Sequence, residues 1–127
     1  MSTTTDLPTE FESKLVRTCR TVVGDELRSI TYFTEDEVAK VYLREDLEWG
    51  VDLVGFAENE RQGFRSQSIY DGSELGSYEA TIRMFEGGYL TRVIEEDVGA
   101  FVTTDRLSID RFEELAAALR ETLRESP

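Results

Sequence analysis

Apolar side chains recur every three or four positions near both ends of the chain, a spacing that places them on one face of an α-helix. Near the start, this spacing predicts a helix over residues 9–23, whose stripe comprises Phe11, Leu15, Cys19 or Thr18, and Val22. Thr9 and Glu12 fit a capping box in its first turn, where each side chain would satisfy a free backbone N–H. Gly24 is placed to end this helix in a left-handed conformation.

Near the end of the chain, a second helix is predicted to follow Ser108, which fits an N-cap, with Asp110 in the first turn. Its apolar stripe comprises Phe112, Leu115, Ala116, Leu119 and Leu123. This stripe is broad enough to bury one face of the helix against a sheet.

Between these helices, apolar and polar residues alternate in a way typical of β-strands. Residues 27–33 and 38–44 carry this pattern and flank the acidic sequence Thr-Glu-Asp-Glu at 34–37, so they predict a hairpin. The same acidic sequence also fits a capping box that opens a helix over 38–48. The hairpin is favoured because alternation and β-branched residues describe 38–44 better than a helical stripe does.

The segment 45–67 predicts a middle helix, because its apolar residues fall mostly on one helical face: Trp49, Leu53, Phe56, Ala57 and Phe64. Gly50, Gly55 and Gly63 each weaken a helix by about 1 kcal/mol where they are interior, so a late start or an early end is left open. The Asp-Gly-Ser sequence at 71–73 marks the loop that follows.

Three further alternating runs follow, at residues 77–85, 89–97 and 99–104. Gly87 and Gly88 separate the first two runs and predict a two-residue hairpin turn, since glycine readily takes positive φ. The acidic sequence Glu-Glu-Asp at 95–97 predicts the next turn. The three runs therefore predict antiparallel strands in a meander.

The predicted order is α-β-β-α-β-β-β-α, which gives an α+β fold with helices packed on a five-stranded antiparallel sheet. Residues 1–8 are small and polar and are expected to be flexible, and 9–127 form a single domain of ordinary size. This topology resembles the roadblock and longin-like domains, within the broad profilin-like architecture. The resemblance implies a small module that dimerises or scaffolds GTPases, and it extends to topology alone.

Three segments of the sequence also resemble a family of small uncharacterised acidic proteins of halophilic archaea: VYLREDL at 41–47, GSYEATIRMFEGG at 76–88 and GAFVTTDRLSIDRFEEL at 99–115. This resemblance carries no functional residue. The composition agrees with it, because 27 acidic residues against 14 basic ones give a net charge of −13, and all basic residues except Lys14 and Lys40 are arginine. Such charge repels itself at low ionic strength and is screened at molar salt, so we expect a salt-adapted protein.

Several classes of chemistry are excluded by composition. The chain has no histidine and one cysteine, which rules out Ser-His-Asp and Cys-His catalytic sets, two-His zinc sites and internal disulfides. The acidic charge argues against nucleic-acid binding. The first residues resemble no signal peptide, and no stretch reaches the roughly 18–20 apolar residues of a membrane span, so we expect the protein in the cytoplasm, away from membranes.

Two arginines in the predicted meander are candidate ligand-binding residues. If Gly87 and Gly88 are the turn residues, Arg83 lies directly opposite Arg92 on one face of the sheet. Two facing cations repel each other unless an anion or a carboxylate joins them. Arg83 and Arg92 therefore bind either an anionic ligand or one of the chain's own carboxylates, and a register slip would separate them.

Trp49 and Tyr42 are candidates for contact with a partner, although core packing of the middle helix also accounts for Trp49. The acidic residues of 45–52 lack the spacing of a calcium loop and fit a solvated surface, so no metal is expected. Cys19 lies on the apolar stripe of the first helix, where a small buried residue is the ordinary case.

The first hypothesis is therefore a non-catalytic interaction or regulatory module, a homodimer that binds an unidentified cytoplasmic protein. The alternative is a sensor domain for a small ligand, with an anion at Arg83 and Arg92 or a pocket between the middle helix and the sheet. An enzyme that uses only carboxylates, Tyr42 or Arg44 is a third class, but no catalytic motif supports it. No cofactor is expected.

Overall fold

A computed structural model describes residues 3–47 and 53–127 as a six-stranded sheet with helices on both faces. The strands are β1 (Thr3–Thr4), β2 (Leu27–Phe33), β3 (Glu37–Leu43), β4 (Thr81–Phe85), β5 (Gly88–Glu95) and β6 (Val98–Thr104). The α-helices are α1 (Thr9–Val23), α2 (Leu53–Glu60), α3 (Gly63–Ser66) and α4 (Ile109–Leu123), and two 3₁₀ segments are η1 (Gly24–Glu26) and η2 (Gln67–Tyr70).

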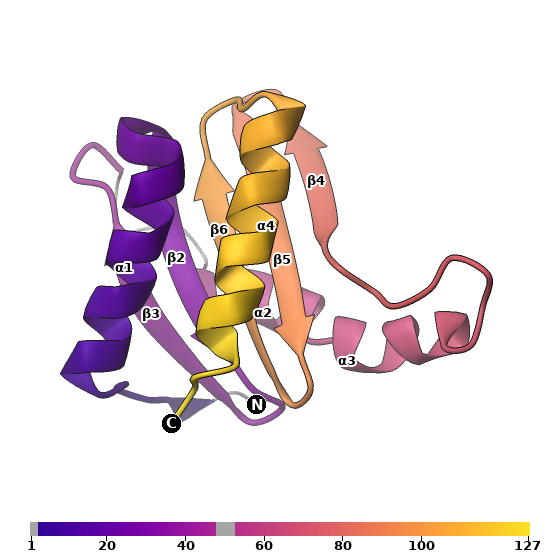
Figure 1. The fold of residues 1–127 in the computed structure, drawn as a ribbon. Coiled ribbons are helices and arrows are strands. Elements are labelled where there is room, and N and C mark those ends of the chain that lie inside the picture. The colour runs from indigo at the N-terminus through magenta and orange to yellow at the C-terminus, as the bar shows by residue number, and fades with distance from the viewer. Residues whose placement is uncertain (1–2, 48–52) are drawn as a thin grey trace.

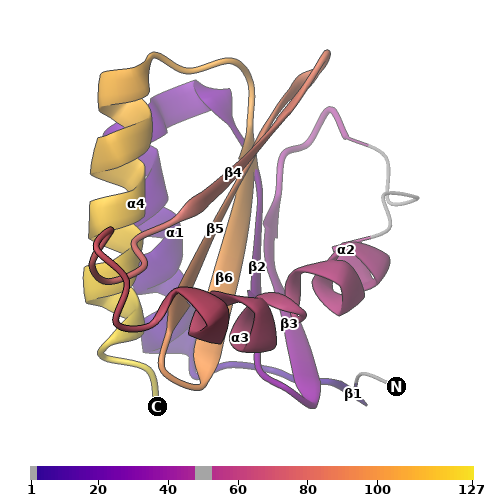
Figure 2. The ribbon, with the colours of Figure 1, turned by 90° about the vertical axis from the view of Figure 1, so that its right-hand side faces the viewer.

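The sheet has the strand order β1-β3-β2-β6-β5-β4. Strands β2 to β6 form the predicted antiparallel sheet, and the hairpin of β2 and β3 excludes a helix over 38–48. The short strand β1, which the sequence pattern does not predict, runs parallel to β3 and pairs Thr3 with Glu37. Helices α1 and α4 cover one face, and α2 and α3 lie on the other (Figures 1 and 2).

Helix α1 has the predicted bounds but not the predicted cap. Its N-cap is Pro8, which makes no side-chain cap hydrogen bond, and the carbonyl of Pro8 accepts from the Glu12 N–H at 3.0 Å. The predicted capping box of Thr9 and Glu12 is therefore wrong, because Thr9 is already helical. Gly24 ends the helix with φ of 59°, a conformation that glycine adopts without strain.

The larger core lies between the sheet and the pair α1 and α4. Leu15 and Cys19 of α1 and Leu115 and Leu119 of α4 are fully buried there. Burial raises the pKa of the Cys19 thiol to about 12, because the thiolate would lose its hydration. Cys19 is thus an apolar packing residue, as the sequence predicts.

The predicted middle helix is broken. Helix α2 ends at Glu60, and a turn at 61–62 separates it from α3 and η2. The guanidinium of Arg61 donates to the carbonyl oxygens of Thr34 at 2.6 Å and Glu37 at 3.0 Å, which ties this turn to the β2–β3 hairpin. A long-range contact of this kind has no periodic signal in the sequence.

A smaller core lies beneath α2 on its face of the sheet. It contains Phe33, Leu53, Ala57, Leu90 and Phe101. The Phe33 ring meets that of Phe64 edge-on at 5.5 Å between centroids and lies 6.2 Å from that of Phe101. Helix α2 packs on β2 and β3, so this face of the sheet is only partly covered near β5 and β4.

Candidate interaction surface

A buried carboxylate at the end of α2 binds both arginines that the sequence singles out. Glu60 Oε2 accepts from Arg83 Nε at 2.6 Å, and Glu60 Oε1 accepts from Arg92 Nη1 at 3.2 Å. The Glu60 and Arg92 side chains are 2% and 4% exposed. Arg92 also donates to Thr81 Oγ1 at 2.7 Å, so the cluster joins α2 to β4 and β5.

The predicted register of these strands is wrong. Arg83 pairs with Leu90, and Arg92 pairs with Thr81, so the two arginines are diagonal neighbours rather than directly opposite. They still share one face of the sheet, because positions two apart on a strand point the same way.

The register shifts because the turn lies one residue earlier than predicted. Residues Glu86 and Gly87 form the turn, and Gly88 is the first residue of β5, paired with Phe85. A Cβ on Gly88 would overlap the carbonyl oxygen of Thr104 on β6. Gly88 is therefore not a turn residue, and its missing side chain lets β5 approach β6 closely.

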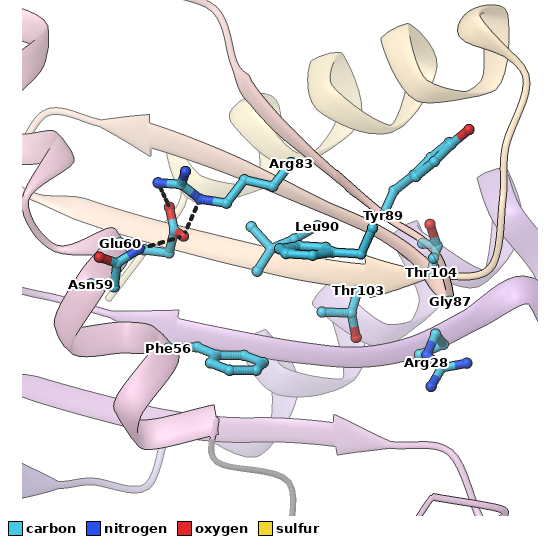
Figure 3. Close-up of a pocket in the computed structure, with 12 residues that line it drawn as sticks. Arg28, Phe56, Asn59, Glu60, Arg83, Gly87, Tyr89, Leu90, Thr103 and Thr104 are labelled. Carbon is cyan, nitrogen blue, oxygen red and sulfur yellow. Dashed lines mark hydrogen bonds and ion pairs between the residues drawn. The ribbon is translucent and has the colours of Figure 1, made fainter.

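The sequence leaves two alternatives for Arg83 and Arg92, an anionic ligand or a carboxylate of the chain. In the structure, the carboxylate of Glu60 binds both arginines. One carboxylate between two guanidinium groups lowers their mutual repulsion and satisfies donors that burial would otherwise leave unpaired. Figure 3 shows Glu60 and Arg83 in contact at one end of a pocket.

Tyr42 lies far from this cluster along the sheet. It belongs to β3, where its hydroxyl accepts from Arg20 Nη1 at 3.1 Å and its ring centroid lies 6.0 Å from the guanidinium carbon. Trp49 lies outside the described residues. The predicted acidic surface segment falls partly outside them too, and its Asp46 binds Arg44 at 2.6 Å.

A pocket of about 400 Å³ lies between α2 and the exposed part of the sheet (Figure 3). Phe56 of α2 faces Leu90 and Thr103 across it, and Arg83 and Arg28 lie at opposite ends. The lining is mostly apolar, which suits a hydrophobic side chain or a small organic molecule. The sequence predicts a pocket between the middle helix and the sheet, but it does not identify Phe56 or Leu90.

Strand β4 is an edge strand with apolar side chains that face solvent. Its only partner among the described strands is β5. Ile82, Met84 and Phe85 are exposed, Met84 to 72% and Phe85 to 57%. This exposed surface was not predicted from the sequence. The sequence does indicate it, because the apolar residues at 82, 84 and 85 fall on both faces of one strand.

The segment before β4 forms an arm that projects beyond this edge (Figure 1). We define the arm as residues 67–80. Ile69, Tyr70 and Leu75 on it are exposed, Leu75 to 78%. In a chain with 32% charged residues, apolar side chains gathered at one edge indicate a contact surface.

At the Arg28 end of the pocket, Asp105 joins two arginines. It accepts from Arg28 Nη1 at 3.1 Å and from Arg44 Nη1 at 2.9 Å. The hydrogen bond from Arg44, more than any other contact, holds the pKa of Asp105 below its ordinary value of 3.8. Folding is then favoured when Asp105 is ionised.

We expect Asp105→Asn to destabilise the protein near neutral pH and to matter less in acid. A lowered folded-state pKa contributes stability that is present above pH about 4 and is lost as the pH falls through the folded-state pKa. Urea unfolding at a series of pH values measures this. Asp71→Asn, at an exposed loop residue, is the control. A gap between wild type and Asp105→Asn that stays constant down to pH about 3 would contradict the expectation.

The described residues contain neither a metal-binding cluster nor a membrane-spanning helix. No group of three or more acidic, histidine or cysteine side chains is arranged to hold a metal ion. Over the described ranges 3–47 and 53–127, every helix is too short or too polar to span a bilayer.

Comparison with known proteins gives a family and a fold. Residues 13–124 match the family described as "Domain of unknown function (DUF7522)". The fold is similar to that of Myxococcus xanthus MglB, with a TM-score of 0.62 and 12% identity over 94% of each chain. It is also similar to the gliding protein MglB from Thermus thermophilus, with a TM-score of 0.67 and 13% identity over 96% of this chain and 95% of that one.

No curated protein matches the sequence. At 12–13% identity, the two solved structures establish the fold alone, and they confirm the predicted roadblock-like topology.

Proposed function

The chain belongs to the family described as "Domain of unknown function (DUF7522)", and from this membership and its MglB-like fold we propose a non-catalytic regulatory module. It works in the cytoplasm of a salt-adapted organism, forms a homodimer and binds another protein. The roadblock-like topology supports this, because modules of that fold dimerise or scaffold GTPases. The observation that carries the homodimer is the exposed edge of β4.

An open edge strand presents unpaired backbone N–H and C=O groups to any strand that approaches. Apolar side chains on both faces of β4, Met84 on one and Phe85 on the other, raise the cost of leaving this edge in water. Pairing with a second strand satisfies the backbone groups and covers both side chains.

The occupant we propose is a second copy of this chain. Two copies of β4, antiparallel about a two-fold axis, extend the sheet across the dimer. The middle of β4 is Arg83, which would approach the Arg83 of the other copy. This is tolerated because each Arg83 is already bound by its own Glu60. The projecting arms then lie against the other copy and bury residues such as Leu75.

Salt would set the strength of this dimer. Each chain carries a net charge of −13, so two copies repel each other strongly in dilute buffer. At about 1 M salt the Debye length is roughly 3 Å, and the apolar contact then dominates. We therefore expect the dimer to strengthen as KCl is added.

Light scattering in about 2–3 M KCl, where charge repulsion is screened, tests the homodimer. Wild type is expected at twice the mass of the chain. Phe85→Glu, which places a carboxylate on the edge strand, is expected at the mass of one chain. Ser13→Glu, at an exposed residue of α1, which packs on β2 and β3 and lies away from the β4 edge, is the matched control and stays dimeric. A wild type that is monomeric at the highest soluble concentration would refute the homodimer.

A second candidate function rests on the pocket beside Phe56. Its volume of about 400 Å³ suits a small molecule, and the Arg28 guanidinium at one end, which Asp105 also binds, has further N–H groups to offer an anionic group. Thermal-shift measurements with nucleotides and organic anions test this sensor function. Stabilisation of wild type, with loss of the effect in Arg28→Ala, would support it. Indifference to every anion would exclude it and leave the interaction module.

A further inference from the structure

A groove of about 520 Å³ lies on the other face of the sheet, between α4 and β4. Ile82 of β4 forms one wall, and Ile109 and Phe112 of α4 form the other. Ile109 is 72% exposed. Because α2 and the pocket beside Phe56 lie on the opposite face, this groove is a separate surface (Figure 2).

The groove exists because two helices are too few to cover five strands. Strands lie about 4.8 Å apart and packed helices about 10 Å apart, so each helix covers about two strands. Helix α1 packs on β2 and β3, and α4 packs on β5 and β6. Strand β4 lies beyond them, and its face on this side is left without a helix (Figure 1).

Helix α4 carries a second stripe that faces this groove. Its core stripe of Leu115, Leu119 and Leu123 is buried against the sheet. The second stripe, Ile109, Phe112, Ala116 and Arg120, has the spacing of one helix face and lines the groove. The small side chains of Ala116 and Ala117 allow another backbone to approach closely. From Ile109 to Arg120 the stripe is about 16 Å long, about three helical turns.

The charges along the groove indicate the chemistry of its occupant. Glu79 and Glu113 lie along its lining and offer carboxylates to basic side chains. Arg120 Nε, at the other end from Ile109, is buried and has no hydrogen-bond acceptor within the described part of the chain. Its Nη1 forms a long ion pair with Glu79 Oε1 at 3.8 Å, which is beyond hydrogen-bond distance. The Arg120 side chain as a whole is 24% exposed, so an acceptor that enters the groove can reach its guanidinium and form a charge-assisted hydrogen bond there.

We propose that this groove binds one amphipathic helix of a partner protein, about three turns long. Its apolar stripe packs on Ile82, Ile109 and Phe112, and lysine or arginine residues beside that stripe meet Glu79 and Glu113. Its C-terminal turn faces Arg120, because the free carbonyl groups there are the acceptors that a helix end supplies. The inference rests on the proposed interaction function and does not depend on the homodimer.

The test uses a designed, fluorescein-labelled peptide of about 14 residues, long enough for the stripe. It has leucine and alanine at helical spacing and lysine on both flanks. Fluorescence anisotropy with the full chain, in moderate and in molar KCl, measures binding. We expect saturable binding to wild type that weakens with salt. A scrambled peptide without the stripe, and a peptide with glutamate in place of lysine, are expected to bind at least about tenfold more weakly.

Two variants locate the site. Ile109→Glu is expected to weaken binding at least about tenfold, and it is compatible with folding because a carboxylate in the first turn of a helix is favourable. Phe85→Glu, on the opposite face, is expected to bind as wild type does. Equal binding by wild type and Ile109→Glu, or no saturable binding by wild type, would overturn the groove proposal. Neither result bears on the mass of wild type measured by light scattering. The groove proposal and the homodimer proposal can therefore fail independently of each other.

Discussion

Replacing Glu60 with alanine is expected to lower the free energy of unfolding by about 3–5 kcal/mol. The Arg92 side chain is 4% exposed, and it would lose the carboxylate that compensates its charge. Thr81 Oγ1 and the Glu60 carbonyl would still accept from Arg92, but neither carries a charge. Removing one partner of a buried ion pair costs more than the pair contributes, because the other charge stays desolvated.

Urea unfolding at high KCl measures this loss without adding a denaturant that is itself a salt. Glu121→Ala, at an exposed residue of α4, is the matched control and is expected to change stability by less than about 0.5 kcal/mol. Arg83→Met is expected to cost less than Glu60→Ala, since Arg83 is 40% exposed and Glu60 keeps Arg92. A loss for Glu60→Ala no larger than that of Glu121→Ala would show that the cluster does not tie β4 and β5 to α2.

Replacing Phe33 with alanine is expected to cost about 3–5 kcal/mol as well, by opening a cavity beneath α2. The Phe33 ring is fully buried and contacts Phe64 and Phe101, so it joins the sheet to the helices on that face. Gly99 leaves the room that this ring fills, because a Cβ there would lie 2.6 Å from Phe33 Cζ.

The same urea unfolding measures Phe33→Ala, and two further variants separate the cavity from general damage. Phe33→Leu keeps most of the volume and is expected to lose less than Phe33→Ala. Gly99→Ala is expected to cost about 1–3 kcal/mol in wild type by overpacking, and less in the Phe33→Leu background. If Gly99→Ala costs the same in both backgrounds, the close packing of Gly99 against the Phe33 ring is not what limits that position.

The elements with a strong period could be predicted from the sequence, and those fixed by long-range contacts could not. Helix α1 has the bounds 9–23 that its apolar spacing predicts, because one face of it is buried along its whole length. The middle helix is broken at 61–62, next to Gly63, and Arg61 in this turn binds the β2–β3 hairpin, a contact between distant parts of the chain that local spacing does not indicate. Strand β1 is two residues long and carries no pattern that could reveal it.

The candidate sites were predicted only in part for the same reason. Arg83 and Arg92 could be singled out because two cations near one hairpin need compensation. Glu60 could not be identified as their partner, because it is one of 27 acidic residues and reaches them only through the packing of α2. The exposed edge of β4 and the groove beside Ile109 exist because β4 is the edge strand of the sheet. The local spacing of apolar residues does not determine which strand lies at the edge.

The burial of Cys19 has a practical consequence for measuring these assemblies. The chain's only thiol is fully buried and is protonated at ordinary pH, so it does not compete for thiol-reactive labels while the protein is folded. A cysteine introduced at position 75 or 109 is then the only reactive one, without removal of the native residue. Spin labels at these positions would allow each proposed contact to be measured as a distance. A label at position 75 reports the distance between the arms of two copies, and a label at position 109 reports the distance between the chain and a labelled peptide in the groove.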